Sequence, residues 1–436
     1  MKQALIIAGG KGTRLSSRLK DIPKPLVDFN GKPLLFHQLN ILKSHGFNNI
    51  LILAGYKSDK IHQYIKSNND FGLKIKIVTE NKPLGTGGAI LSAYKYLEKT
   101  FLVVYGDTIF DIDLKRFLQF HKRSKKDISL FVHPNDHPHD SDIIEVDDKN
   151  NVIALHPYPH KSKKYLKNLV NAALYMIQKE SLLKVLEKKI KFSDFFKDLL
   201  PKLLQLGTRI TAYNSPEYIK DCGTPARLDQ AINDFKEGKI GGSNLSVPQN
   251  TIFIDRDGTL NIEVGHLSDE NKLKLINGAD KAIKLINKSK YRCIVITNQP
   301  VIARGECSFD QLQNIHNKLE TILGKSSAYI DRIYFCPHHP DSGYENEVKS
   351  LKIKCNCRKP KIGLLETAKK DFNIDFSKSW LIGDRTVDIK TAKNAGMKSI
   401  LVKTGDAGRD EKYKVKPDFI KKDILSAVKY ILEETE

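Results

Sequence analysis

The fold is decided by the stretch Thr251-Ile-Phe-Ile-Asp-Arg-Asp-Gly-Thr-Leu260. Four mostly apolar, β-prone residues lead into Asp255, and a second acid, Asp257, precedes the turn at Gly258. A short apolar run that closes in a glycine turn predicts a buried strand whose last side chains emerge at the strand end. In open α/β sheets, ligands bind at that end. Two neighbouring carboxylates there can attack a substrate and move a proton.

Length and composition set the broad class of the protein. A chain of 436 residues with 40% apolar residues predicts two or three domains with ordinary cores. The sequence lacks a long apolar run, and the apolar N-terminal segment is too short for a signal peptide, so we expect a cytoplasmic protein without a membrane span. The net charge of +21 comes from scattered lysines. Without a recognition motif, this pattern favours a solvated surface over nucleic-acid binding, and a positive field also suits phosphorylated substrates.

Two loops in the first half are suited to phosphates. The segment Gly9-Gly-Lys-Gly-Thr-Arg-Leu15 directly follows an apolar strand. Its glycines let the backbone approach a phosphate, and its two basic residues supply positive charge. Pro23-Lys-Pro-Leu26 then holds Lys24 in a stiff segment. A flexible turn is the plainer alternative for a single glycine-rich loop.

An alternation of strand and helix patterns continues from Leu34 to Val78, which indicates a parallel sheet with helices on both faces. A second glycine-rich segment, Glu80 to Ala89, opens another helix, and the strand Phe101 to Tyr105 ends near Asp107. An acid at a buried strand tip, facing two glycine-rich loops, can hold magnesium against a triphosphate. For an isolated aspartate, capping of the next segment would be the simpler interpretation.

These segments, together with Tyr218-Ile-Lys-Asp-Cys-Gly-Thr-Pro225, resemble the ordered motifs of the sugar-1-phosphate nucleotidyltransferases, and most of all the heptose-1-phosphate guanylyltransferases. The resemblance implies that Asp107 and Asp221 coordinate magnesium while the sugar phosphate attacks the α-phosphorus without a protein nucleophile. It assigns Lys24 and Arg14 to catalysis and Asn171 to the sugar. The residues that it assigns to the nucleotide are Gly9, Gly10, Gly12, Thr13, Gly85, Gly87 and Gly88.

One departure from this family lies in Val152-Ile-Ala-Leu-His-Pro-Tyr-Pro-His-Lys161. The family usually has a Glu-Lys pair here, with the lysine on the sugar phosphate. His156 and Lys161 are the candidates to replace it, and the sequence does not decide between them. Because the Glu-Lys pair is missing, an alternative to transferase activity is that the first half only binds a nucleotide.

The segment 239–250 is rich in Gly, Ser and Pro, so we expect a linker between domains spanning 1–238 and 251–436. Beyond it, two more strand patterns end in Thr297-Asn298 and in Asp384. Three strand tips of this composition resemble the haloacid-dehalogenase-type phosphatases. The resemblance implies that Asp255 is the nucleophile and that Asp257 is the general acid and then the base. Further residues that it assigns are Thr297, Asn298 and Lys359 at the phosphoryl group, Asp384 with Asp255 and the Asp257 carbonyl on magnesium, and Arg358 and Arg385 at the substrate.

A cluster of cysteines narrows the phosphatase subtype. Cys336, His338, Cys355 and Cys357 provide three thiolates and one imidazole, a donor set suited to structural zinc. The alternatives are reduced buried thiols or a redox pair, and His339 is a rival to His338. This cluster resembles that of the heptose-bisphosphate phosphatases and their histidinol-phosphatase relatives, although Pro300-Val301 replaces their common Ser-Gly. In that family the zinc would fix the loop that carries Lys359.

The sequence therefore predicts an α/β protein in which a Rossmann-like mixed sheet is followed by a haloacid-dehalogenase-like parallel sheet with a zinc-bound loop. Together, the two resemblances imply that the function is synthesis of a nucleotide-activated heptose for a bacterial surface glycan. The expected partners are a nucleoside triphosphate, with GTP favoured, and heptose phosphates. Histidinol phosphate and a hexose 1-phosphate are alternative substrates for the two halves.

Overall fold

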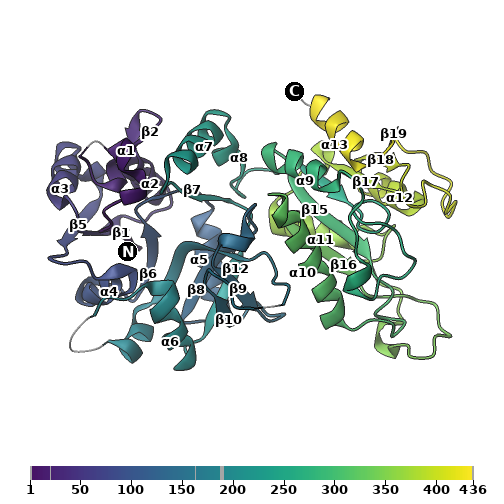
Figure 1. The fold of residues 1–436 in the computed structure, drawn as a ribbon, viewed down its shortest axis with the longest axis horizontal. Helices are drawn as coiled ribbons and strands as arrows, with labels where there is room; N and C mark the ends of the chain where they lie inside the picture. Colours follow the sequence, from purple (N-terminus) through teal and green to yellow (C-terminus); the bar gives the residue numbers. More distant parts are fainter. Residues whose placement is uncertain (1, 20, 163, 187–190, 435–436) are drawn as a thin grey trace. The chain divides into compact units, whose positions relative to one another are not determined.

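The computed structural model describes residues 2–19, 21–162, 164–186 and 191–434 (Figure 1). The chain divides into two compact units. The first comprises Met1–His133, Asp142–Pro159 and Val170–Asn244, and the second comprises Pro134–Ser141, His160–Leu169 and Leu245–Glu436. The segment expected to be an irregular linker contains a short helix, α8 (Lys239–Gly242), and Leu245 already packs in a core of the second unit.

The first unit is built on a nine-stranded mixed sheet. Its parallel part contains β6 (Thr100–Tyr105), β1 (Gln3–Ala8), β4 (Asn49–Ala54) and β5 (Lys74–Thr79), side by side in that order. β11 (Val170–Gln178) pairs antiparallel with β6 and extends the sheet. Beyond it lie β9 (Ile143–Val146), β10 (Val152–His156), β8 (Ile128–His133) and β12 (Ile210–Asn214). The expected mixed sheet is confirmed.

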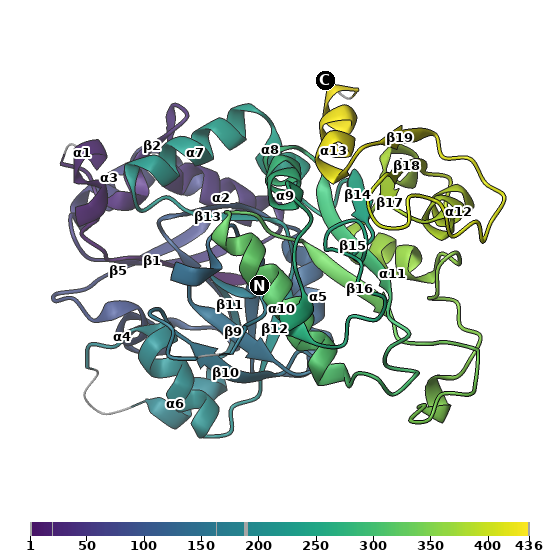
Figure 2. The ribbon, with the colours of Figure 1, turned by 45° about the vertical axis from the view of Figure 1, so that its right-hand side comes forward.

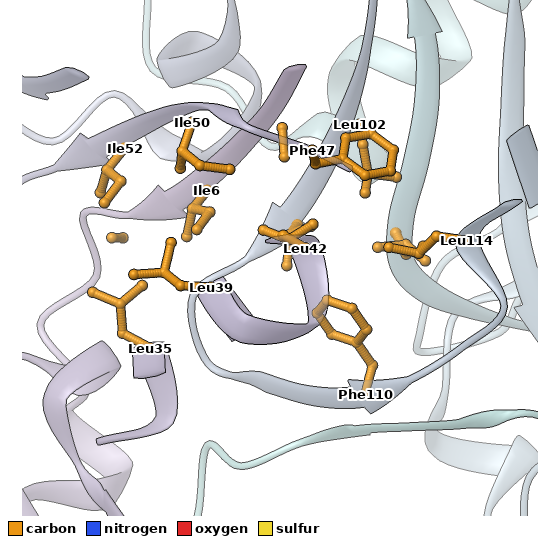
Figure 3. Close-up of a cluster of buried hydrophobic side chains, with 14 of the residues drawn as sticks. Ile6, Leu35, Leu39, Leu42, Phe47, Ile50, Ile52, Leu102, Phe110 and Leu114 are labelled. Atoms are coloured by element: carbon orange, nitrogen blue, oxygen red, sulfur yellow. The ribbon is translucent and has the colours of Figure 1, made fainter. Parts of the chain in front are cut away.

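Helix α2 (Leu34–Ser44) covers one face of this sheet, as Figure 3 shows. Leu35, Leu39 and Leu42 recur at helical spacing and are fully buried in one cluster with Ile6 and Ile50 of the sheet. The other α-helices in the described part of the unit are α1 (Ser16–Leu19), α3 (Ser58–Ser67), α4 (Gly85–Ser92), α5 (Leu114–Ser124), α6 (Leu200–Gln205), α7 (Pro225–Lys236) and the short α8.

Two short strands place the acidic motifs of the first unit next to each other. β7 (Thr108–Asp111) pairs antiparallel with β13 (Tyr218–Asp221), so that Thr108 is the partner of Asp221. The backbone carbonyl of Asp107 also accepts a hydrogen bond from the N–H of Cys222 at 2.8 Å. Residues more than a hundred positions apart in the sequence are thereby brought to one place.

The second unit contains six parallel strands, several of which are labelled in Figure 2. Their order is β16 (Arg332–Cys336), β15 (Arg292–Asn298), β14 (Thr251–Ile254), β17 (Trp380–Gly383), β18 (Lys398–Val402) and β19 (Phe419–Lys421). All four residues of β14 are buried, as expected for a central strand of a parallel sheet that is covered on both faces.

Alternate side chains of β14 enter two different cores. Ile252 and Ile254 belong to a cluster that includes residues of α9 (Ala279–Lys288), α10 (Phe309–Lys325) and α13 (Ile424–Glu433). Phe253 belongs to a cluster with residues of α11 (Gly363–Phe372) and α12 (Thr386–Asn394). The alternation places helices on both faces of the sheet.

Two helices of the structure begin without a side-chain cap. Ser58 is the first residue of α3, and Lys57 occupies the capping position before it. Helix α12 begins at Thr386, because the chain turns into a helix directly after the tip of β17. No helix in the described part of the chain is both long and apolar enough to cross a membrane.

The core of the second unit can be tested with its own reporter, because Trp380 is the single tryptophan of the chain and lies in the same cluster as Ile283. We expect Ile283→Ala to lower the free energy of unfolding by about 2–5 kcal/mol, since the cavity adds to the lost burial. Urea unfolding followed by Trp380 fluorescence measures the change. Lys281→Ala, on the exposed face of the same helix, should stay within about 0.5 kcal/mol. Equal effects of the two substitutions would contradict the assignment of this core.

Candidate active sites and a metal centre

Three parallel strands deliver the polar residues of the second unit to one edge of its sheet. Asp255 directly follows β14, Asp384 directly follows β17, and Thr297 with Asn298 ends β15. Since β14 lies between β15 and β17, these tips are neighbours (Figure 2). This is the edge at which ligands bind in open α/β sheets.

A buried lysine joins the acids at this edge. The ammonium nitrogen of Lys359 lies 2.9 Å from Oδ1 of Asp255 and 2.6 Å from Oδ1 of Asp388, and it donates to the carbonyl of Ile296 at 3.1 Å. Burial disfavours the charged ammonium, but the two carboxylates outweigh it and raise the pKa of Lys359 above its ordinary value. Lys359 is therefore a fixed positive charge beside the Asp255 carboxylate.

Three carboxylates converge next to this lysine. Oxygen atoms of Asp255, Asp384 and Asp388 lie within 4.8 Å of one another, and all three residues are buried. Burial and the charges of Asp255 and Asp388 raise the pKa of Asp384 to about 8. Burial and the charge of Asp255 raise the pKa of Asp388 to about 7. Buried carboxylates that repel one another suit a hard divalent cation with oxygen ligands, so the set fits magnesium.

Asp388 is the member of this group that the sequence analysis did not assign. It lies on the first turn of α12, four positions after Asp384, and its Oδ2 accepts from the backbone N–H of Arg385 at 3.2 Å. Because α12 begins directly after the strand tip, Asp384 and Asp388 point toward the same site. The signal was present in Asp384-Arg-Thr-Val-Asp388, two acids at helical spacing after a strand.

Glycines make room for these acids. A Cβ atom at Gly258 or Gly405 would collide with the carboxylate of Asp384, and one at Gly383 would collide with Asp388. Gly258 and Gly405 also have positive φ values, of 76° and 56°. The backbone is therefore wrapped closely around the acidic group, in conformations that favour glycine.

Asp257 is held apart from the three convergent acids. Its carboxylate accepts from both Nε and a terminal nitrogen of Arg256, from Asn261 Nδ2 at 3.0 Å and from Gln299 Nε2 at 2.8 Å. Burial alone would raise the pKa of Asp257, but these donors hold it below its ordinary value. The carboxylate of Asp257 is thus ionised in this arrangement, and its side chain is not part of the convergent set.

The other expected phosphatase residues make contacts of different kinds. The Nδ2 of Asn298 donates to the carbonyl of Lys359 at 3.2 Å, and its Oδ1 accepts from the Lys359 N–H at 3.0 Å, so Asn298 positions the lysine loop. Thr297 accepts from Gln299 Nε2 at 2.8 Å. Arg358 donates to the carbonyl of His338 at 3.3 Å, and Arg385 pairs with Glu263 at 3.1 Å.

The cysteine cluster assembles as one compact donor set. Sγ atoms of Cys336, Cys355 and Cys357 lie 3.2–3.5 Å apart, and Nδ1 of His338 lies 3.2 Å from the Cys357 sulfur. A disulfide needs about 2.05 Å. In a tetrahedral zinc site with Zn–S distances of about 2.3 Å, neighbouring sulfur atoms lie about 3.8 Å apart, so these thiols are too far apart for a disulfide and need to separate by only a few tenths of an ångström to hold the ion. The set therefore fits zinc.

His339 is not part of this donor set. Its ring lies 3.5 Å from Arg304 and 3.6 Å from Asp341.

The cysteine cluster is connected to the acidic site through the backbone. Cys336 pairs in register with Asn298, and its carbonyl accepts from the N–H of Gln299 at 2.8 Å. Cys357 lies two residues before Lys359 in the chain. A metal in the cluster would therefore fix one end of the loop that presents Lys359, which is an indirect role in any chemistry at Asp255.

In the first unit, Lys24 and Asp107 form an ion pair. A Cβ atom at Gly223 would lie 3.0 Å from the Lys24 nitrogen and against the Asp221 carboxylate, so Asp221 lies close to the lysine that pairs with Asp107. Asp221 also pairs with Arg227 at 2.7 Å, a contact that the sequence analysis did not identify. Two carboxylates leave most positions of an octahedral magnesium to substrate phosphates and water, which is how this ion commonly binds. The residues therefore fit magnesium bound together with a nucleotide.

The glycine-rich loop Gly9–Gly12 follows β1 and ends in a left-handed residue, Gly12, with φ of 66°. Gly10, before this residue, and Thr13 and Arg14, after it, are exposed. A Cβ atom at Gly9 would approach the carboxylate of Glu80 to 3.1 Å. The loop is therefore open on one side and closely packed on the other.

The glycines of the second loop have a packing role. The carbonyl of Ser193 accepts from the N–H groups of Gly87 at 2.8 Å and Gly88 at 3.3 Å, and a Cβ atom at Gly85 would collide with it. These glycines permit close approach of the segment before the helical stretch Phe195–Gln205. The resemblance assigns these glycines to the nucleotide; in the structure the N–H groups of Gly87 and Gly88 are engaged within the protein.

The sugar-contact residues are also engaged. The amide of Asn171 donates to the hydroxyl of Tyr175 at 3.0 Å. His156, a candidate for the missing family contact, lies 2.8 Å from the carboxylate of Glu145 on the neighbouring strand. Lys161 is exposed, in a segment that belongs to the second unit.

Zinc binding is directly measurable. We expect about one zinc per chain in the wild type by elemental analysis, and nearly none in Cys355→Ser, because a closed site needs all four ligands. Cys307→Ser is the matched control, since Cys307 is buried outside the cluster. A full equivalent of zinc in Cys355→Ser would contradict the assignment.

The acidic group predicts a pH dependence. Asp384 and Asp388 have pKa values raised from 3.8 to about 8 and about 7, so each binds its proton more tightly when folded. Without magnesium, their contribution to stability is complete below pH about 4 and is lost as the pH rises to about 8. Magnesium binds the ionised acids, so its stabilising effect should grow over the same range. Thermal unfolding followed by Trp380 fluorescence, with zinc retained and magnesium varied, tests this. A magnesium effect that shrinks with rising pH would refute it.

Comparison with known proteins follows the division of the chain. The nucleotidyl transferase family profile matches residues 3–238, more than half of the chain, and a HAD-hydrolase-like profile matches residues 356–427. The D-glycero-beta-D-manno-heptose-1,7-bisphosphate 7-phosphatase of Haemophilus ducreyi is 37% identical over 182 residues, which cover 41% of this chain and 97% of that protein. The D-glycero-alpha-D-manno-heptose 1-phosphate guanylyltransferase of Campylobacter jejuni is 33% identical over 224 residues, which cover 51% of this chain and 95% of that protein.

Among solved structures, HddC from Yersinia pseudotuberculosis matches 54% of this chain and 100% of its own length, with 31% identity and a TM-score of 0.47. The sequence relatives cover the two halves separately and almost completely. The chain belongs to the nucleotidyl transferase family through its first half and to the family of the heptose-bisphosphate phosphatases, within the HAD-type hydrolases, through its second.

Proposed function

We propose that this chain carries two consecutive enzymes of nucleotide-activated heptose synthesis. The second half removes the 7-phosphate of D-glycero-D-manno-heptose 1,7-bisphosphate, and the first half transfers GMP from GTP to the resulting heptose 1-phosphate. The carrying observation is that relatives with these two activities each align along nearly their full length with one half of a single chain. The product of one reaction is the substrate of the other. The proposed domains span 1–238 and 251–436.

The phosphatase reaction begins at Asp255. Its Oδ1 is engaged by Lys359 at 2.9 Å and by the N–H of Arg256 at 2.7 Å, so we assign the attack on phosphorus to Oδ2. Asp257, whose carboxylate is ionised before substrate binds, takes up a proton from solvent as the charged substrate enters; the bond between phosphorus and the sugar oxygen then breaks, and Asp257 gives that oxygen this proton. In the second step Asp257 takes a proton from water, the water oxygen attacks phosphorus, and the Asp255 carboxylate leaves.

Lys359 keeps its positive charge throughout this sequence, because both neighbouring acids favour its protonated form. It offsets negative charge next to the attacked phosphoryl group. Magnesium, bound by Asp255, Asp384 and Asp388, would supply further neutralisation of the phosphoryl oxygens. Zinc at the cysteine cluster would fix the loop and take no part in the chemistry.

The transferase reaction needs positioning and charge rather than a nucleophile of the protein. The exposed loop residues up to Arg14 offer N–H groups and positive charge to a triphosphate, and Lys24, which pairs with Asp107, packs near Gly12 of this loop. The oxygen of the sugar phosphate attacks the α-phosphorus and pyrophosphate leaves. Magnesium held by Asp107 and Asp221 would neutralise the phosphates in this step.

The anomer and the location complete the proposal. The Haemophilus phosphatase is named for the β anomer and the Campylobacter guanylyltransferase for the α anomer. Consecutive action requires that both halves of this chain accept the same anomer of the heptose. We propose that it is the α anomer, because guanylyl transfer is the last step and determines the anomer of the product. We place the enzyme in the cytoplasm, where nucleoside triphosphates are available.

A coupled assay tests both activities together. The full chain receives the α or the β anomer of heptose 1,7-bisphosphate, magnesium, and one of GTP, ATP, CTP or UTP, while phosphate and nucleotide sugar are measured. We expect GDP-heptose from the α anomer with GTP alone. The isosteric change Asp255→Asn should lower phosphate release at least about 10³-fold, because it removes the nucleophile. Asp107→Asn should abolish nucleotide sugar while phosphate release continues.

Other outcomes separate the alternatives. Phosphate release without nucleotide sugar for any triphosphate would refute guanylyl transfer and leave a first half that only binds nucleotide. Faster hydrolysis of histidinol phosphate than of either heptose anomer would refute the proposed substrate.

A further inference from the structure

Arg256 is the largest fully buried side chain of the described residues. It stands between the two aspartates of the opening motif and has no exposed surface. A guanidinium removed from water is costly unless each of its donors and its charge find partners. The partners of Arg256 therefore show what the burial achieves.

The guanidinium joins Asp257 on one side and a histidine on the other. Its Nε donates to Asp257 Oδ1 at 3.1 Å, and one terminal nitrogen donates to Oδ1 at 2.9 Å and to Oδ2 at 2.8 Å. The second terminal nitrogen lies 3.1 Å from Nε2 of His316. A fork of this kind fixes both the place and the plane of a carboxylate.

His316 is built to accept that hydrogen bond. It lies on α10, where Ile315 and Leu319 are buried in the core, and its own ring is buried against Phe335 with the ring centroids 5.6 Å apart. Burial and the nearby guanidinium hold the pKa of His316 well below its ordinary value, so the ring is neutral. A neutral ring that accepts at Nε2 carries its proton on Nδ1.

We propose that His316 is a positioning residue of the phosphatase half, which fixes Arg256 so that Arg256 holds the Asp257 carboxylate in place to receive a proton from water. In that step a water O–H bond breaks, its proton goes to Asp257, the oxygen bonds to phosphorus, and the bond between phosphorus and Asp255 breaks. His316 touches neither substrate nor reacting atoms. The inference rests on the proposed aspartyl-phosphate mechanism.

The step that depends on His316 can be identified. Without an acceptor at residue 316, a terminal nitrogen of Arg256 is left buried without its partner, and the guanidinium is free to shift away from Asp257. Attack by Asp255 on an activated phosphate ester needs little help from an acid, whereas hydrolysis of the aspartyl-phosphate needs the base. Loss of His316 should therefore slow the second step more than the first.

The experiment compares three variants of the full, zinc-loaded chain with p-nitrophenyl phosphate as the probe. His316→Phe keeps a ring but removes the acceptor, and His316→Gln restores an acceptor near the position of Nε2. Gln313→Ala, at an exposed position of the same helix, is the control. The readouts are kcat, KM, the fraction of acid-quenched enzyme that carries phosphate, and the melting temperature.

For His316→Phe we expect kcat to fall about 10–100-fold with KM changed less than about threefold, because a misplaced base slows one chemical step. A burst of nitrophenol and a larger phosphorylated fraction should accompany the fall. His316→Gln should recover most of the rate, and Gln313→Ala should match the wild type.

Two results would overturn the inference. One is a wild-type rate in His316→Phe. The other is a loss that His316→Gln does not recover, together with an unchanged phosphorylated fraction, which would mark a structural role alone. If the Asp255→Asn variant released phosphate at the wild-type rate, that result would instead overturn the proposed mechanism and the inference with it.

Discussion

The buried ammonium of Lys359 is the interaction on which the second unit depends. Three acids converge where burial and their mutual repulsion raise the pKa values of two of them, and Lys359 is a cation that contacts two of the three. The sheet supplies the acids, while a separate loop supplies the lysine. That loop is held at one end by the cysteine cluster and at its centre by the two hydrogen bonds from Asn298. The sheet, the loop and the cysteine cluster therefore all help to hold the Lys359 ammonium against the carboxylates that it neutralises.

The first unit also has a lysine–aspartate ion pair at its candidate site, but this pair is less deeply buried. Lys24 and Asp107 form its central ion pair, with side-chain exposures of 13% and 25%, against 2% and 0% for Lys359 and Asp388. An ion pair open to water is weaker and exchanges partners more easily. A site that must admit a large triphosphate and release pyrophosphate benefits from such a pair. A site that must protect a covalent phosphoryl intermediate benefits from the buried one.

Local patterns were sufficient to predict the fold classes, the strand tips and the cysteine quartet. Thr251–Ile254 is a buried strand because four apolar or β-prone residues precede a glycine turn, and the quartet follows from two short spaced pairs. Contacts between distant segments could not be predicted. Arg256 and His316 are sixty residues apart, and Ser193 reaches Gly87 from across the first unit. A hydrogen bond between an internal arginine and a neutral histidine leaves no periodic trace in the sequence.

Both sheets are formed by one continuous chain, and each has its own core. One round of translation therefore produces one phosphatase and one transferase in a fixed ratio. Differences in expression cannot change the balance between supply and use of the intermediate sugar phosphate. At a given supply of substrates, the kinetic constants of the two halves then set its steady-state level, so selection on pathway flux acts on the kinetics encoded by one chain.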